Sequence, residues 1–201
     1  IVALVFALLV TNLKRVLAIA AGTLIVGVLL VETMAPGTIW SPYYKITTYA
    51  EGKETVVEVN NIFHQSMAPV REKEYFYQWP YTVFGDGFED VLILGAGSGT
   101  DVAASLMHSS KRIDAVEIDP RIYELGVELN PEQPYADPRV EVHIDDGRAF
   151  MRRTGKMFDL VLFALPDSLT SVAGQSSLRL ESYLFTKEAF TRARDLLTID
   201  G

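Results

Sequence analysis

Three glycines, Gly95, Gly97 and Gly99, follow the apolar run "DVLIL" and precede the amphipathic run "TDVAASLM". Glycine tolerates the left-handed backbone of a tight turn, and it lets a ligand lie directly against the main chain. A turn between a strand and a helix also brings the N-terminal N–H groups of the helix to that ligand. The spacing therefore predicts a strand–turn–helix unit that binds a ligand in place of the missing side chains.

Acidic residues follow the next two apolar runs. Glu117 ends "AVE", 18 residues after Gly99, and Asp145 and Asp146 end "VEVHIDD". A carboxylate at the end of the second strand accepts hydrogen bonds from both ribose hydroxyls of an adenosine and repels a 2′-phosphate. A carboxylate after the third strand suits the exocyclic amine of adenine, which is a donor. Together these residues predict one nucleoside-binding crevice.

The details of the motifs separate two kinds of nucleoside ligand. Dinucleotide dehydrogenases share the glycine turn and the acid on the second strand. Here, however, the turn reads "GAGSGT" rather than glycine-x-glycine-x-x-glycine, and the third strand ends in "DDG". We therefore favour an adenosyl-sulfonium ligand, S-adenosylmethionine or its decarboxylated form, over NAD.

The region that must position these residues alternates strand-like and helix-like segments from Asp90 onward. Buried strands separated by helices indicate a parallel sheet covered on both faces, hence an α/β, Rossmann-like doubly wound fold. Pro120 suits the first turn of one predicted helix, and Thr186 suits the N-cap of another. The predicted strands and helices are, in order, "DVLILGAG", "TDVAASLMHS", "IDAVEID", "PRIYELGVEL", "VEVHIDD", "GRAFMRRT", "FDLVLFAL" and "TKEAFTRARDLL".

Two smaller regions precede this fold. Residues 1–33 hold two apolar runs with Lys14 and Arg15 in a short loop between them, and the second run is long enough for a membrane helix. Residues 34–70 alternate like a β-hairpin, in which "YYKITTY" and "ETVVEVNNIF" are the strands and "AEGK" is the turn. We expect a transmembrane region at 1–33, a small β-hairpin domain at 34–70 and the nucleoside-binding domain at 71–201, with the chain cut at both ends.

Composition excludes several classes of function. From Met34 onward, 16 lysines and arginines face 25 aspartates and glutamates, which disfavours nucleic acid as a partner and tolerates a cationic substrate. The chain has no cysteine, so disulfides and thiolate metal sites are excluded. His64, His108 and His143 are widely spaced without a metal-ligand pattern, so we predict no metal.

From Ser41 to Gly201, about four fifths of the chain, the sequence resembles the spermidine and spermine synthases. The segments that carry the resemblance are "SPYYKI", "EYFYQW", "VLILGAGSGTD", "AVEIDP", "HIDDGRAF", "FDLVLFALPDS" and "ESYLFTKEAF". The apolar start, "GAGSGTDVA" and "LPDS" followed by "SSLRLESYLFT" are similar to the bacterial integral-membrane, spermidine synthase-like branch. The resemblance implies a methyltransferase-type Rossmann sheet preceded by a β-hairpin domain.

The resemblance also implies an activity, namely transfer of an aminopropyl group from decarboxylated S-adenosylmethionine to a polyamine. It implies that Glu117 binds the ribose and that Asp146, beside Asp145, binds the adenine amine. Tyr77 and Gln78 would form the wall of the substrate groove, Tyr77 close to the chemistry. The loop of Gly95, Gly97, Ser98 and Gly99 would cradle the methionine-derived part. A carboxylate would serve as counter-ion and base for the attacking amine.

The chain departs from the family's pattern where that chemistry takes place. Ser98 stands where the family has the aspartate that faces the aminopropyl amine, and Asp101 is our candidate for this contact, although a carboxylate also suits the first turn of a helix. Ala164 stands where the family has its first aspartate after the fourth strand, so Asp167 is our candidate for the base. Two alternatives stay open, namely an S-adenosylmethionine-dependent methyltransferase of the same fold and a catalytically degenerate, membrane-attached nucleoside-binding module.

The remaining expectations concern cellular context. We expect attachment to the bacterial inner membrane through the N-terminal segment. Lys14 and Arg15 in the short loop favour a cytoplasmic loop and a domain on the outer side. The nucleoside ligand is found in the cytoplasm, and on this ground we expect the catalytic domain there. Family members are often dimers, so the resemblance implies a homodimer.

Overall fold

The computed structural model of the protein describes residues 2–34, 37–164, 184–199 and 201. The chain divides into two compact units, Ile1–Thr38 and Ile39–Gly201. Asp167, the predicted base, lies outside the described residues.

The first unit is dominated by helix α1, Val2–Thr33. The predicted loop at Lys14 and Arg15 is wrong, because the helix continues through both residues. Residues 2–20 hold neither glycine nor proline, and leucine, lysine and arginine are good helix formers, so nothing there ends the helix. The segment Arg15–Thr33 has no buried residue and is long and apolar enough to cross a membrane.

The second unit begins with a four-stranded antiparallel sheet instead of the predicted hairpin. Asn60 and Asn61 both have positive φ, 52° and 62°, so they form a two-residue turn that splits the predicted second strand in two. The strands lie side by side in the same order as along the chain. Their bounds are β1 Thr38–Trp40, β2 Lys45–Glu51, β3 Glu54–Val59 and β4 Ile62–Met67.

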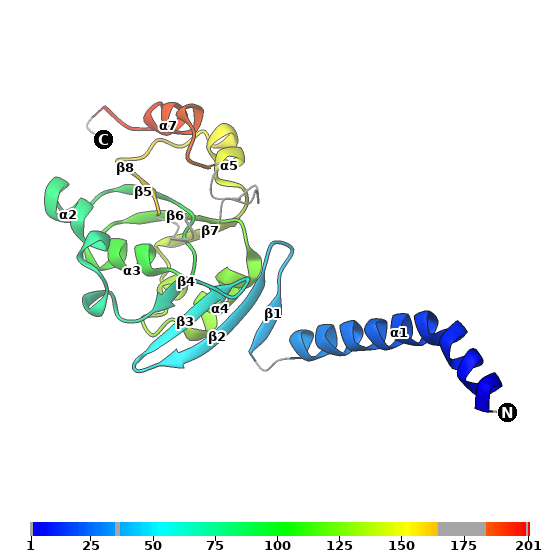
Figure 1. The fold of residues 1–201 in the computed structure, drawn as a ribbon. Helices are drawn as coiled ribbons and strands as arrows, with labels where there is room; N and C mark the ends of the chain where they lie inside the picture. The colour runs from blue at the N-terminus through cyan, green and yellow to red at the C-terminus, as the bar shows by residue number, and fades with distance from the viewer. Residues whose placement is uncertain (1, 35–36, 165–183, 200) are drawn as a thin grey trace. The chain divides into compact units, whose positions relative to one another are not determined.

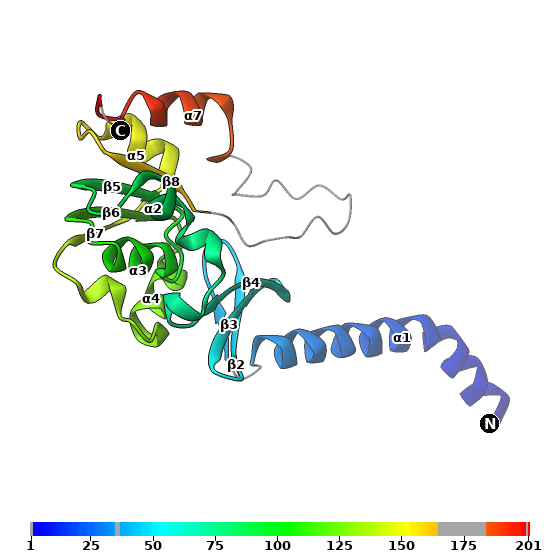
Figure 2. The same ribbon diagram turned by 90° about the vertical axis from the view of Figure 1, so that its left-hand side faces the viewer.

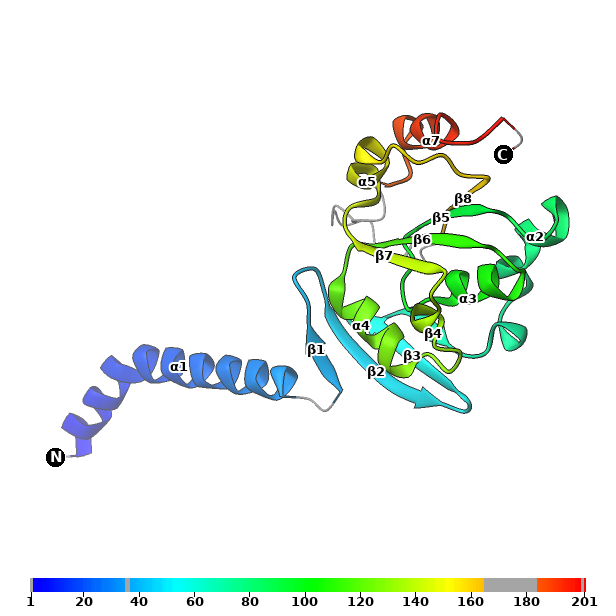
Figure 3. The same cartoon turned by 180° about the vertical axis from the view of Figure 1, so that it is seen from behind.

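In Figure 3 the ribbon of this antiparallel sheet runs beside helix α4. The sheet and the rest of the second unit share a hydrophobic core. Ile46, Val57 and Met67 of the sheet pack against Ile122 and Leu125 of helix α4, Pro120–Leu129. All five side chains are at most 4% exposed, so the contact is dry. The burial fixes the sheet against the helix that follows Glu117, which is how a strand of this sheet reaches the predicted nucleoside crevice.

Four parallel strands form the centre of the second unit, in the order β7-β6-β5-β8. Alternate residues of β5 enter different cores: Leu92 and Leu94 pack on one side, and Val91 and Ile93 on the other. Both faces are therefore covered, which confirms the predicted doubly wound α/β fold. The strands are β5 Asp90–Leu94, β6 Arg112–Glu117, β7 Val140–Ile144 and β8 Leu160–Phe163.

Helices cover the two faces of the parallel sheet, as Figures 1 and 2 show. Helices α3, Thr100–Met107, and α4 lie on one side, and α5, Gly147–Arg153, and α7, Lys187–Arg194, lie on the other. Thr186 caps α7 as predicted, accepting a hydrogen bond from the Ala189 N–H at 3.2 Å. The aromatic segment before β5 forms short helices: η1 Val70–Glu72, η2 Tyr75–Tyr77 and α2 Trp79–Phe84. A further short helix, η3 Pro134–Ala136, precedes β7.

Candidate functional site

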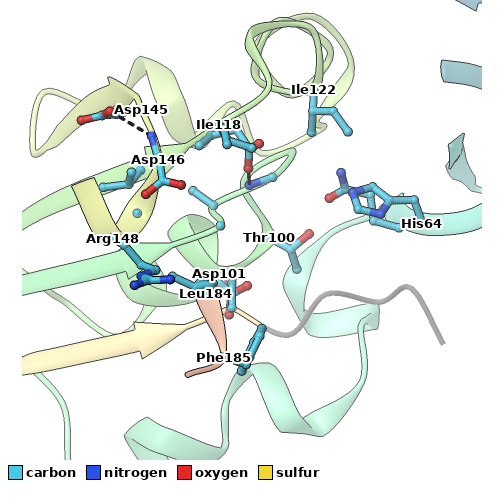
Figure 4. A pocket seen from close by; sticks show the side chains of 18 of the residues that line it. His64, Thr100, Asp101, Ile118, Ile122, Asp145, Asp146, Arg148, Leu184 and Phe185 are labelled. Atoms are coloured by element: carbon cyan, nitrogen blue, oxygen red, sulfur yellow. Dashed lines mark hydrogen bonds between the residues drawn. The ribbon is translucent and has the colours of Figure 1, made fainter. Parts of the chain in front are cut away.

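A cleft lies at the carboxyl ends of β5, β6 and β7, the edge at which doubly wound folds bind ligands. Figure 4 shows Asp145 and Asp146 at one end of it, His64 at the other, and Thr100 and Asp101 between them. The residues that line the cleft are Tyr44, His64, Gln65, Tyr77, Gly95, Ala96, Gly97, Thr100, Asp101, Val116, Glu117, Ile118, Ile122, Asp145, Asp146, Gly147, Arg148, Ala164, Leu184 and Phe185.

The glycine loop after β5 has the backbone that the sequence predicts. Gly95, Gly97 and Gly99 have φ values of 83°, 57° and 96°, all in the left-handed region. Gly95 and Gly97 line the cleft. Gly99 does not, and its role is different: a Cβ there would lie 2.7 Å from Cγ of Pro134, so it allows η3 to approach the loop. The Tyr135 hydroxyl then donates to the Gly97 carbonyl at 2.7 Å.

Glu117 connects the end of β6 to this loop. Its Oε2 accepts a hydrogen bond from the Gly97 N–H at 2.8 Å, and its Oε1 accepts one from the Asp119 N–H at 2.8 Å. The side chain lines the cleft although the residue is 7% exposed. Burial raises the pKa of Glu117 from 4.5 to about 6, partly offset by these backbone hydrogen bonds. A carboxylate with lone pairs left over for hydroxyl donors thus faces the cleft.

Ser98 does not face the cleft, contrary to the prediction. The residue is fully buried, and its N–H and Oγ donate to Oε1 of Gln65 at 3.1 and 2.9 Å. Its carbonyl accepts from Nδ2 of Asn130 at 2.9 Å. Between Gly97 and Gly99 the backbone turns this residue inward, toward β4 and the end of α4.

The two aspartates after β7 line the cleft, as predicted. Asp146 caps α5, since its Oδ1 accepts from the Ala149 N–H at 2.8 Å. Asp145 accepts from the Asp146 N–H at 2.9 Å and forms an ion pair with Arg153. The cap therefore fixes the position of the Asp146 carboxylate at the cleft.

The remaining predicted residues divide between the cleft and its surroundings. Tyr77 lines the cleft and is 8% exposed, and Asp101 lines it from the first turn of α3. Gln78 is not among the lining residues, because its Nε2 is directed to the Val70 carbonyl, 3.5 Å away. Ala164 lines the cleft just after β8, so this strand end contributes a methyl group at the position where the family's pattern has an aspartate.

Sequence reasoning missed the part of the site that comes from the antiparallel sheet. Neighbouring residues of a regular strand point to opposite faces, yet His64 and Gln65 both line the cleft. The cause is a bulge: Val57 pairs with Gln65 and Glu58 with Phe63, which leaves His64 as the extra residue. Ile118, Ile122, Arg148, Leu184 and Phe185 were missed as well, and the position of Ile118 beside Glu117 was the available signal.

A second acidic cluster lies outside the cleft lining. Asp114, Glu141 and His143 bring ligand-type atoms within 4.8 Å of one another. The Lys156 ammonium occupies this cluster, 2.7 Å from Asp114 and 2.8 Å from Glu141. His143 also contacts Asp114 at 2.7 Å. An ammonium at the centre repels a metal ion, so we interpret the cluster as an ion-pair network between β6, β7 and the segment after α5.

Comparison with known families agrees with this geometry. The profile of the spermine/spermidine synthase domain matches residues 71–201, which hold the parallel sheet and every acidic residue of the cleft. The chain belongs to this family. His64 and Gln65 also line the cleft, and they lie in β4, outside the residues that the family profile matches.

Curated relatives and solved structures extend the comparison. The chain is 34% identical over 119 residues to a polyamine aminopropyltransferase of Pyrobaculum aerophilum, covering 56% of this chain and 38% of that protein. It is 30% identical over 118 residues to polyamine aminopropyltransferase 2 of Bacillus cereus, covering 55% and 30%. The matched part therefore spans about two fifths or less of these relatives.

The fold is similar to that of solved spermidine synthases. One, in complex with the transition-state analogue AdoDATO, has a TM-score of 0.63 and 20% identity, covering 80% of this chain and 55% of the other. The enzyme from Thermotoga maritima has a TM-score of 0.61 and 20% identity, covering 80% and 54%. These structures cover 80% of this chain, which is more than the residues 71–201 that the family profile matches. The structural similarity therefore extends beyond residues 71–201.

The raised pKa of Glu117 predicts a pH-dependent stability. Between the unfolded pKa of 4.5 and the folded value of about 6, the folded state binds more protons than the unfolded state. The free energy of unfolding should therefore fall as pH rises through this window, by up to about 2 kcal/mol. Glu117→Gln removes this titration. Urea denaturation between pH 4.5 and 7 measures the free energy of unfolding of both proteins. We expect the wild-type value minus the variant value to decrease as pH rises. A difference that does not change with pH would contradict the raised pKa of Glu117.

Proposed function

We propose that this chain is the nucleoside-binding part of an aminopropyltransferase, which transfers the three-carbon amine of decarboxylated S-adenosylmethionine to a polyamine. The observation that carries the proposal is the cleft itself, in a member of the spermine/spermidine synthase family. Glu117 offers acceptors for ribose hydroxyls, and Asp146 offers one for the adenine amine. Gly95 and Gly97 leave room for the methionine-derived part beside the N-terminus of α3.

The acidic lining also suits the acceptor substrate. A polyamine is a cation, and Asp101, Glu117, Asp145 and Asp146 contribute carboxylates to the cleft against the one arginine, Arg148, among its described lining residues. Tyr77 adds an aromatic face, which already has the Lys73 ammonium 5.8 Å from its ring centroid. Cations are favoured near such faces and such carboxylates. Tyr77 is therefore our candidate for the wall along which the polyamine lies.

The proposed chemistry needs a base and an oriented nucleophile. A neutral amine nitrogen of the polyamine attacks the carbon next to the sulfonium, a C–N bond forms, and the C–S bond breaks. The bonding electrons return to sulfur, which leaves as the neutral thioether 5′-methylthioadenosine, and the nitrogen loses a proton to a carboxylate. Asp167 remains our candidate for this base, and Asp101 for the contact to the aminopropyl ammonium.

The named relatives do not favour the second candidate, a methyltransferase of the same fold, and its motivation is a feature of the site alone. Neither Ser98 nor Ala164 provides a carboxylate, and Ser98 is turned away from the cleft. A site without those two acids has less to attract the ammonium of a decarboxylated tail. The competing ligand is S-adenosylmethionine, and its use would release S-adenosylhomocysteine.

Product analysis distinguishes these candidates. The whole protein, supplied with decarboxylated S-adenosylmethionine and a diamine, should release 5′-methylthioadenosine and the lengthened amine in equal amounts, both measured by chromatography. Glu117→Ala should lower kcat/KM about a hundredfold, because two hydrogen bonds to a charged group are lost at about 1.5 kcal/mol each. Glu124→Ala serves as the control, since this exposed acid pairs with Arg121 on the surface of α4.

Each outcome of that assay is informative. Release of S-adenosylhomocysteine from S-adenosylmethionine would favour the methyltransferase, and tight nucleoside binding without turnover would favour the degenerate binding module. Asp167→Asn should abolish turnover while binding of 5′-methylthioadenosine persists. Unchanged turnover in this variant would remove Asp167 from the mechanism.

We further propose that α1 attaches the protein to the bacterial inner membrane, with the nucleoside-binding domain in the cytoplasm. The support is the apolar segment Arg15–Thr33, about 28 Å long as a helix, which matches the hydrocarbon core of a bilayer. Homodimerisation remains a prediction from the family.

The membrane proposal predicts that the full chain stays in the membrane pellet after alkaline carbonate extraction. Replacing Ile25 and Leu29 together by lysine should release it, because each lysine costs about 3 kcal/mol at the centre of a span. Replacing the same two residues by alanine is the matched control and should keep the protein in the pellet. A wild-type chain that carbonate extracts, or a domain that protease digests from the periplasmic side, would contradict the proposal.

A further inference from the structure

Gln65 holds the glycine loop in a way that fixes the orientation of its carboxamide. Its Oε1 accepts hydrogen bonds from the Ser98 N–H at 3.1 Å and from the Ser98 Oγ at 2.9 Å. A backbone N–H can only donate, so the oxygen of the carboxamide must face Ser98. The NH2 group of Gln65 therefore points elsewhere.

That NH2 group is a buried donor at the cleft. Nε2 of Gln65 has no hydrogen-bond partner among the described parts of the chain and almost no exposed surface, and Gln65 lines the cleft. Leaving such a donor unpaired costs about 1–3 kcal/mol. A ligand that accepts a hydrogen bond there would recover this free energy.

Glu117 and Gln65 act on neighbouring peptide groups of the same loop. Glu117 accepts from the N–H of Gly97, and Gln65 accepts from the N–H of Ser98. A Cβ on Gly97 would lie 2.7 Å from Oε1 and 3.4 Å from Nε2 of Gln65, so the carboxamide lies against Gly97. A carboxylate and an NH2 group thus flank Gly97, and both belong to residues of the cleft lining.

The chemistry of this pair is selective. An ionised carboxylate only accepts hydrogen bonds and a carboxamide NH2 only donates them, whereas a hydroxyl does both. We propose that Gln65 is a second ribose-reading residue: its Nε2 donates to a ribose hydroxyl oxygen while the ribose hydroxyls donate to Glu117. The inference rests on the proposed function, since it takes the ligand to be an adenosine derivative.

The consequence is selection of ribose over deoxyribose by a residue of the antiparallel sheet. Removal of the bridging hydroxyl from the ligand leaves the Gln65 donor unpaired again, and sites of this kind strongly reject such analogues. The bulge at His64 makes the contact possible, because it brings Gln65 into the lining together with its neighbour.

The test compares three ligands by calorimetry on the whole protein in detergent: 5′-methylthioadenosine, its 2′-deoxy analogue and its 3′-deoxy analogue. Gln65→Glu keeps an oxygen for the Ser98 N–H but replaces the donor by an acceptor. We expect this variant to bind 5′-methylthioadenosine at least tenfold more weakly than the wild type does. For the analogue that lacks the bridging hydroxyl, we expect wild type and variant to bind within about twofold of each other, a pattern that a loop-holding role would not produce.

Gln65→Met adds no charge but removes both the donor and the acceptor for the Ser98 N–H. We therefore expect one loss of affinity that all three ligands share, and a further loss of at least tenfold only for the ligands that carry the bridging hydroxyl. Equal loss of affinity for all three ligands in both variants would show that Gln65 only holds the loop, and would overturn the inference while leaving the proposed function intact. A wild type that binds none of the three ligands would overturn the proposed function, and the inference with it.

Discussion

The site depends on one buried interaction, the pair of hydrogen bonds between the Glu117 carboxylate and the N–H groups of Gly97 and Asp119. These bonds join the turn after β5 to the turn after β6, so two separate strand ends become one surface. The conformation requires glycine at 97, where φ is 57° and a side chain would meet Gln65. It also requires a carboxylate that stays buried, which is why the pKa of Glu117 rises.

Around this contact, the two sheets of the second unit act as a single support. The antiparallel sheet packs on α4 through Ile122 and Leu125, and it also reaches the glycine loop through Gln65. Asn130, at the end of α4, and Tyr135, in η3, bind the carbonyls of Ser98 and Gly97. The loop is therefore held from four sides by side chains, which keeps its cleft-facing backbone in place before a ligand arrives.

Local patterns in the sequence predicted the features that depend on local chemistry. The alternation of strands and helices, the glycine turn, the cap at Thr186, the acid that ends β6 and the acids after β7 follow from periodicity and from the shared edge of parallel strands. The inward turn of Ser98 could not be predicted, because its partner Gln65 is 33 residues away and reaches it through a bulge. The Asn60–Asn61 turn was a local signal that sequence reasoning overlooked, and Asp167 stays a prediction.

We propose that this cleft binds an adenosyl-sulfonium ligand with a decarboxylated tail. The most direct measurement is calorimetric titration of the whole protein with decarboxylated S-adenosylmethionine and with S-adenosylmethionine under the same conditions. We expect the decarboxylated ligand to bind more tightly, since the carboxylates of the cleft attract its ammonium and repel an added carboxylate. Tighter binding of S-adenosylmethionine, or binding of neither ligand, would contradict it.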